Sequence, residues 1–133
     1  MFRKKLLRHI FRFHGFKESF IFAFKGILYL FLYHRNMRII FLMGIAAFLL
    51  GIFLGLSGLE LSVLCLTITI VFMAEIFNTA IEMVIDMYTR KHKVLIKFIK
   101  DIAAAVVLLA SLNAIAVGYA LFYKRVLALT GGR

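Results

Sequence analysis

The chain has 133 residues, of which 64% are hydrophobic, and its mean hydropathy is +1.00. Soluble domains are usually about 45–50% apolar, so this composition excludes an ordinary soluble protein and indicates an integral membrane protein with a single domain, 1–133. The 17 Lys and Arg against 6 Asp and Glu give a net charge of +11, which we assign to contacts with anionic lipid headgroups and not to nucleic acid binding.

Cysteine and proline content narrow the class further. The single cysteine, Cys65, lies in an apolar run and cannot pair within the chain, so a disulfide framework is excluded. The sequence has no Pro, so no proline interrupts a helix. The basic N-terminal region is too long for a cleavable signal, and we expect none.

The first 36 residues are predicted to form a basic lead and a surface helix. Residues 1–14 combine basic and aromatic side chains, as expected for a segment that contacts lipid headgroups. Within 15–36, apolar residues recur every three or four positions, whereas Lys17, Glu18 and Lys25 fall on a different face. This pattern predicts an amphipathic helix that lies in the membrane interface. Its apolar face consists of Phe16, Phe20, Phe24, Ile27 and Phe31.

Three long apolar runs follow, and we expect each to be a transmembrane helix, with spans at 38–58, 60–88 and 99–123. A bilayer core takes roughly 20 helical residues, and every backbone polar group in lipid must be satisfied, which favours helices. The second run is long enough only if the polar stretch at its end belongs to the helix. We therefore predict an all-α membrane protein with an N-terminal amphipathic surface helix and three transmembrane helices.

The distribution of Lys and Arg predicts the orientation in the membrane. Nine lie at or before position 38, none in the turn 57–60, five in 90–100 and three in the C-terminal tail. The positive-inside rule then places the N-terminus and the loop 87–100 in the cytoplasm and the C-terminus outside.

The end of the second span, AEIFNTAIEMVIDMY, carries an unusual polar stripe. At about 100° per residue, Glu75, Asn78, Glu82 and Asp86 fall within an arc of about 80°. Carboxylates inside a membrane are costly and normally face a cavity or a partner, so these residues are candidates for function. Alternatively, Glu82 and Asp86 reach the headgroup level and pair with Arg90 or Lys93, which suits Asp86 best. Glu75 lies about three turns deeper, where that explanation is weak.

The stripe favours phosphate chemistry. A carboxylate cluster repels itself unless a cation joins it, and hard cations such as Mg²⁺ take oxygen ligands alongside phosphates. A carboxylate can also take the proton of an oxygen nucleophile. Lys100 and Asp101 open the third span, where Lys100 can neutralise phosphate charge in the same pocket. The pattern fits phosphoryl transfer from a nucleotide to a lipid, although the sequence has no Walker A motif or glycine-rich phosphate loop.

The segment AEIFNTAIEMVIDMYTRKHKVLIKFIKDIAAAVVLL resembles the small bacterial integral-membrane diacylglycerol kinase family, whose Gram-positive-type members act on undecaprenol. The pattern is Glu-x-x-Asn-x-x-x-Glu-x-x-x-Asp, then a basic loop, then Lys-Asp-x-Ala. The stretch FAFKGILYLFLYHRNMRI is similar to the family's surface helix, so the resemblance spans residues 16–123. It implies a homotrimer in the bacterial plasma membrane, with sites between protomers and MgATP-dependent phosphorylation of a lipid alcohol.

The resemblance also implies roles for individual residues. Glu75 matches the family's general base, and Glu82 matches its metal-binding carboxylate. His34 stands where the family usually has a second metal-binding Glu. Because Mg²⁺ prefers oxygen, His34 is a ligand for a softer metal, leaves the position to water, or is an interfacial bystander, and the change can weaken activity. The positions that match other active-site residues, which would bind nucleotide and phosphate, are Asn78, Asp86, Lys100 and Asp101.

The resemblance leaves the substrate less defined than the chemistry. The RNMRI segment and the Phe-rich surface helix look more like the undecaprenol kinase branch, so we expect undecaprenol, with diacylglycerol as the alternative. A different class, a small proton or cation channel or transporter, explains Glu75 but gives Lys100 and Asp101 no role. An inert structural membrane protein is a further alternative.

Overall fold

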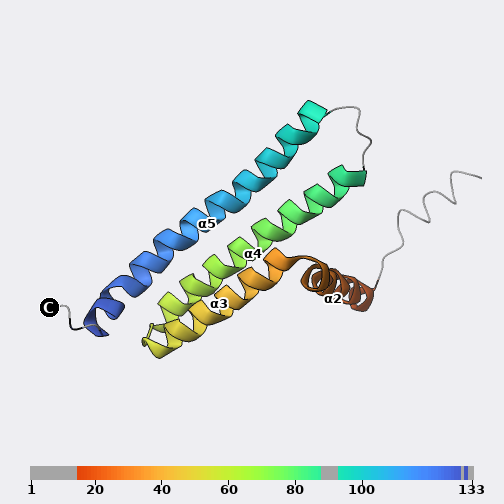
Figure 1. The fold of residues 1–133 in the computed structure, drawn as a ribbon. Helices are drawn as coiled ribbons and strands as arrows, with labels where there is room; N and C mark the ends of the chain where they lie inside the picture. The colour runs from red at the N-terminus through yellow and green to blue at the C-terminus, as the bar shows by residue number, and fades with distance from the viewer. Residues whose placement is uncertain (1–14, 88–92, 130, 132–133) are drawn as a thin grey trace, which may run out of the picture. The chain divides into compact units, whose positions relative to one another are not determined.

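The computed structural model describes residues 15–87, 93–129 and 131, and these residues form four helices and no strand (Figure 1). The helices are α2 (Phe16–Tyr33), α3 (Arg35–Phe53), α4 (Gly58–Met87) and α5 (Lys93–Leu129). The predicted all-α fold is confirmed for this part of the chain. The chain divides into two compact units, Met1–Arg35 and Asn36–Arg133, which we describe separately.

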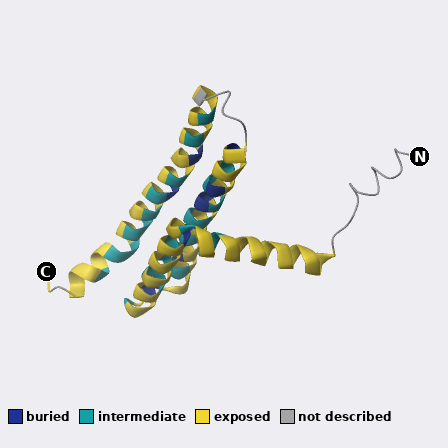
Figure 2. Ribbon diagram, turned by 45° about the vertical axis from the view of Figure 1, so that its right-hand side comes forward, coloured by how far each residue is buried: buried dark blue, intermediate teal, exposed yellow. Residues whose placement is uncertain are grey.

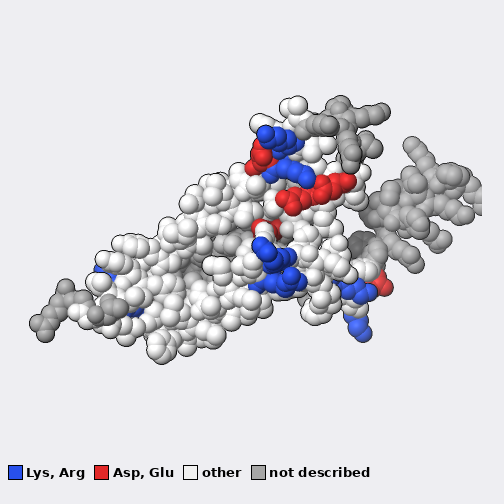
Figure 3. Space-filling view, in the orientation of Figure 1, with Lys and Arg blue, Asp and Glu red and all other residues white. Residues whose placement is uncertain are grey.

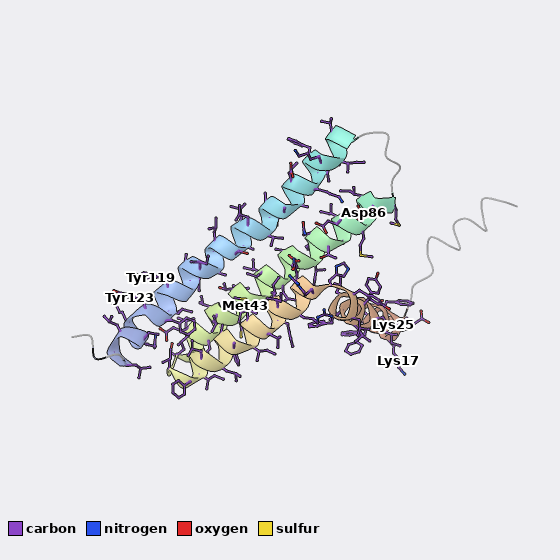
Figure 4. The ribbon with its side chains drawn as sticks, viewed as in Figure 1. Lys17, Lys25, Met43, Asp86, Tyr119 and Tyr123 are labelled. Atoms are coloured by element: carbon purple, nitrogen blue, oxygen red, sulfur yellow. The ribbon has the colours of Figure 1, made fainter. Side chains whose placement is uncertain are left out.

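The helix α2 in the first unit lies within the segment 15–36, where the sequence predicted an amphipathic helix. None of its residues is buried, and Phe16, Phe20 and Phe24 are 89%, 73% and 69% exposed. Lys17 and Lys25 extend from the same helix (Figure 4). The helix ends at His34, whose extended backbone leaves the helical path while its N–H still donates to the carbonyl of Leu30 at 2.9 Å. The interfacial position of α2 stays a prediction, and the basic lead 1–14 lies outside the described residues.

Three of the described helices are long and apolar enough to cross a membrane: α3, α4 and the part of α5 from Val94, with mean hydropathies of 2.0, 2.0 and 2.1. The second apolar run is long enough to span a bilayer only with the polar stretch included, and α4 does continue through that stretch to Met87. The helix α5 extends beyond 99–123 at both ends. Charged residues mark where a span leaves the membrane, but Lys and Arg are good helix formers and do not stop the helix.

The turn between α3 and α4 is built by Gly55. Its φ of +68° lies in the left-handed region, which is open to glycine without strain. The N–H of Gly55 donates to the carbonyl of Ile52 and the N–H of Leu56 to that of Gly51, both at 3.0 Å, which is the Schellman pattern of helix termination. Leu56 is buried beyond the turn, so the reversal is fixed by backbone bonds and by packing.

The helices α3 and α4 approach closely at two glycines of α3. A Cβ atom on Gly44 would lie 2.8 Å from Cγ2 of Ile68, and one on Gly51 would lie 3.1 Å from Cδ2 of Leu64. Phe41 and Phe72 meet edge to face, with ring centroids 6.0 Å apart. Small residues at such contacts are typical of helix packing in membranes, where close backbone approach replaces the hydrophobic effect.

The helices α4 and α5 lie side by side and antiparallel, as Figures 1 and 2 show, with ion pairs between them. On α5 the buried positions include Ala103 and Ala110, which are 3% and 7% exposed and seven residues apart, so they share one face. Most other side chains of this pair are exposed in the single chain (Figure 2). The ion pairs to α5 are made by Glu60 and Asp86, which lie near the two ends of α4, and Glu75 is the stripe carboxylate that is buried.

Candidate functional site

The stripe on α4 passes from a buried position to exposed ones. Glu75 is 5% exposed, whereas Glu82 and Asp86 are exposed. At 1.5 Å per residue, Glu82 lies about 10 Å further along the helix than Glu75, and Asp86 about 16 Å further. The buried carboxylate thus lies at the deep end of a polar stripe that opens toward the end of α4.

Asn78 connects the deep and the open parts of the stripe. Its Nδ2 donates to Oε1 of Glu82 at 3.3 Å. Its Oδ1 is buried, and no described residue donates a hydrogen bond to it. A buried amide oxygen that accepts no hydrogen bond makes the folded chain less stable. Oδ1 is therefore available to accept a hydrogen bond from a bound molecule or to ligate a bound metal ion.

The helix α5 brings Lys100 to this end of α4. Its Nζ donates to Oδ1 of Asp86 at 2.7 Å, and the two side chains are 39% and 67% exposed. Figure 4 labels Asp86 near the end of α4, and Figure 3 shows acidic and basic side chains gathered at this end of the helix pair. Asp101 is the next residue of α5 and is also exposed. Lys100 of α5 and Asp86 of α4 thus form an ion pair beside Glu82.

The oxygen donors present fit a metal that arrives with phosphates. Among the residues that the structure describes, no three His, Cys, Asp or Glu side chains converge on one point, so the chain alone offers no complete metal cage. Mg²⁺, however, usually takes one or two carboxylates and completes its shell with phosphate oxygens and water. Glu82 and Oδ1 of Asn78 are hard oxygen donors on one face of α4 and suit that arrangement.

The structure also adds one residue to the predicted stripe. Thr79 is 3% exposed and lies four residues after Glu75, on the same face of α4. The spacing alone could have shown this, but our sequence reasoning followed charges and amides and passed over a hydroxyl. His34 belongs to the other unit, so its place relative to Glu82 stays a prediction.

The sequence model of the family described as prokaryotic diacylglycerol kinase matches residues 21–122 of the chain. The chain belongs to this family. The match includes all residues of the stripe as well as Lys100 and Asp101, and it confirms the family expected from the sequence pattern. Within the matched residues, the polar stripe of this chain lies on one face of α4.

Two relatives in this family carry different names. A diacylglycerol kinase of Synechocystis sp. is 38% identical over 112 residues, which are 84% of this chain and 64% of that protein. An undecaprenol kinase of Bacillus subtilis is 32% identical over 110 residues, which are 83% of this chain and 89% of that protein. The chain therefore spans less than two thirds of the Synechocystis relative and most of the Bacillus one.

Proposed function

We propose that the chain is an ATP-dependent lipid kinase that phosphorylates the hydroxyl of undecaprenol at the cytoplasmic face of the bacterial plasma membrane. The observation that carries the proposal is the buried Glu75, which shares a helix face with an amide and two carboxylates. The exposed end of this polar stripe lies beside the cation of Lys100. A base, oxygen donors and a phosphate-binding cation are the groups that phosphoryl transfer to an alcohol needs.

In this proposal Glu75 is the general base. It takes the proton of the lipid hydroxyl, and the lipid oxygen then forms a bond to the γ-phosphorus of ATP. The bond between that phosphorus and the β,γ-bridging oxygen breaks, and ADP carries the electron pair away. The burial of Glu75 keeps bulk water from taking the place of the lipid hydroxyl, so it favours transfer over ATP hydrolysis.

Lys100 and the other polar residues hold the nucleotide. The ammonium group of Lys100 stabilises negative charge on the transferring phosphate, and Asp86 holds Lys100 at the end of α4 until the phosphate arrives. Asp101 and Asn78 help to seat the nucleotide. Mg²⁺, when bound, neutralises charge on the phosphate oxygens. Glu82 would hold it, with Oδ1 of Asn78 as a further oxygen donor.

We propose that His34 changes which metal ion the site prefers. An imidazole nitrogen is a poorer donor for Mg²⁺ than the carboxylate usual in the family. The proposal therefore assigns the metal to Glu82, phosphate oxygens and water, and it expects a softer metal such as Mn²⁺ to use His34 better than Mg²⁺ does.

Undecaprenol is favoured by the RNMRI segment and by the near full-length match to the Bacillus undecaprenol kinase. Diacylglycerol is a second candidate, because the Synechocystis relative of that name is the more identical of the two, at 38% against 32%. Both lipids offer a primary hydroxyl to Glu75, so the proposed chemistry is the same for either.

Competition between the two lipids tests the substrate. The purified chain in mixed micelles receives labelled ATP and equal mole fractions of undecaprenol and diacylglycerol, and the two phosphorylated lipids are separated and counted. We expect the ratio of kcat/KM to favour undecaprenol. A ratio in favour of diacylglycerol would show that diacylglycerol is the preferred substrate and would leave the assignment as a lipid kinase unchanged.

A further inference from the structure

A second ion pair joins α4 and α5 at the end opposite the polar stripe. Nη2 of Arg125 on α5 donates to Oε2 of Glu60 on α4 at 2.9 Å, and the two side chains are 31% and 30% exposed. Neither residue belongs to the proposed active site, because Glu60 lies 15 residues, or about 22 Å along the helix, from Glu75.

Several hydrogen bonds hold this pair in place. The N–H of Ser57 donates to the same Oε2 of Glu60 at 2.8 Å, and the N–H of Glu60 donates to Oγ of Ser57 at 3.4 Å, the reciprocal pattern of a capping box. Nη1 of Arg125 also donates to the carbonyl of Leu121 at 2.9 Å. The carboxylate is thereby tied to the start of α4 and the guanidinium to the backbone of α5, so the contact joins two fixed points and not two mobile side chains.

The two ion pairs between α4 and α5 are spaced alike on both helices. Glu60 and Asp86 are 26 residues apart on α4, and Lys100 and Arg125 are 25 residues apart on α5. At 1.5 Å per residue these separations are about 39 Å and about 38 Å. Both pairs can therefore form together in the observed axial position of α5, and sliding by one helical turn, about 5.4 Å, would stretch both.

The remaining contacts in this interface define the axial position weakly. Between transmembrane helices there is no hydrophobic driving force, because lipid tails are as apolar as the side chains they replace. Among the described residues of α5, the buried positions are Ala103 and Ala110, so no large buried side chain of α5 sets its axial position. The pair of Lys100 and Asp86 is the more exposed of the two ion pairs, so solvent weakens it more.

We propose that Glu60 and Arg125 are positioning residues that fix the axial register of α5 on α4 and so hold Lys100 at the site beside Asp86. The effect on register follows from the helix pair alone. The consequence for phosphate transfer rests on the proposed function.

The register is measured directly with spin labels on Val84 of α4 and Leu112 of α5, which are 50% and 53% exposed and outside the site. Cys65 is first replaced by Ser so that the labels alone react. The two positions are offset along the helix axes, so sliding of α5 along α4 changes the distance between the two labels. Excess unlabelled chain is added during reconstitution, so that pulsed dipolar spectroscopy counts only distances within one chain.

Glu60→Gln and Arg125→Gln should each broaden the distance distribution or add a population displaced by up to one helical turn, about 5.4 Å. Glu60→Gln is the cleaner variant because Gln can still accept from Ser57 in the capping box, so α4 keeps its start. The matched control is Lys124→Gln, which removes an exposed cation next to Arg125 and should leave the distribution unchanged. Unchanged distributions in both test variants, or equal broadening in Lys124→Gln, would overturn the proposal.

A kinetic measurement tests the consequence for Lys100. Arg125→Gln should lower kcat on the order of tenfold with the lipid KM unchanged, since a small misplacement of a catalytic cation slows transfer without removing the lipid site. Arg125→Lys keeps the charge and should recover most of the rate. Unchanged kcat in a chain with a broadened distribution would refute the link to Lys100. Absence of lipid phosphorylation in the unsubstituted chain would refute the proposed function, while the distances would still decide the register.

Discussion

Glu75 is buried on α4, seven residues before the exposed Glu82, and the proposed chemistry requires it to accept a proton. Glu75→Gln keeps the shape of the side chain and removes the base. We expect kcat to fall by about 10²–10⁴-fold, the usual contribution of a positioned general base, while the chain stays folded and assembled. The matched control is Glu18→Gln on α2, where an exposed carboxylate is removed and activity should persist. Near-normal turnover of a folded Glu75→Gln chain would refute the assignment.

Glu82 is exposed and accepts a hydrogen bond from Asn78, so its carboxylate is accessible to a nucleotide-bound metal. Glu82→Asp keeps an oxygen ligand on a shorter stem, whereas Glu82→Ala removes it. Raising the Mg²⁺ concentration should therefore partly restore the rate of Glu82→Asp and not that of Glu82→Ala. Titration of the initial rate with Mg²⁺ measures this. The same metal dependence in both variants and in the unsubstituted chain would show that Glu82 is not a ligand.

At the scale of the elements, the contact between α3 and α4 depends on the absence of a side chain at Gly44. A Cβ atom there would lie 2.8 Å from Cγ2 of Ile68, a β-branched side chain that cannot easily turn away. Gly44→Ala should lower the free energy of unfolding by about 1–3 kcal/mol, as expected for overpacking. Unfolding of the detergent-solubilised chain by increasing mole fractions of SDS measures this.

Gly118 on α5 is the control for that prediction, because a Cβ atom there meets nothing within 4 Å. Gly118→Ala should be neutral or should stabilise the helix by up to about 1 kcal/mol, since Ala is the better helix former. The combination of Gly44→Ala with Ile68→Ala should lose less stability than the sum of the two single changes. Additive losses, or equal effects at Gly44 and Gly118, would contradict the close packing of α3 on α4.

The sequence predicted the helices better than it predicted their ends. The apolar run before Glu75 was too short to span a bilayer unless α4 continued through the polar residues, and it does so to Met87. The third span was predicted as 99–123, an apolar run between charged residues, but those charges indicate membrane depth, and the helix α5 extends from Lys93 to Leu129. Termini depend on local backbone bonding, which the charge pattern does not record.

The candidate site was predictable only where it lies on one helix. The face shared by Glu75, Asn78, Glu82 and Asp86 follows from helical spacing alone. The bond from Lys100 to Asp86 joins residues 14 positions apart, and the bond from Arg125 to Glu60 joins residues 65 positions apart. Such contacts depend on how α5 packs on α4, and periodicity within one segment carries no information about that.

At the scale of the whole molecule, one chain leaves much of its polar stripe uncovered. Glu82, Asp86 and Asp101 are all exposed, and carboxylates at the edge of a bilayer are stable only if water or a partner covers them. A second copy that packs over this face would cover them and complete a site between protomers. We therefore predict a homotrimer, as the family resemblance implies. Native mass spectrometry should find three copies, and a fully active monomer would contradict this prediction.

The most direct test of the central claim is the transfer of labelled γ-phosphate from ATP to a lipid alcohol by the purified chain in mixed micelles. We predict that the label appears in the lipid, that ADP forms in equal amount, and that both require the lipid hydroxyl and a divalent cation. Folded, assembled chain that conducts protons or cations but transfers no label to undecaprenol or diacylglycerol would contradict the account and favour a channel or transporter.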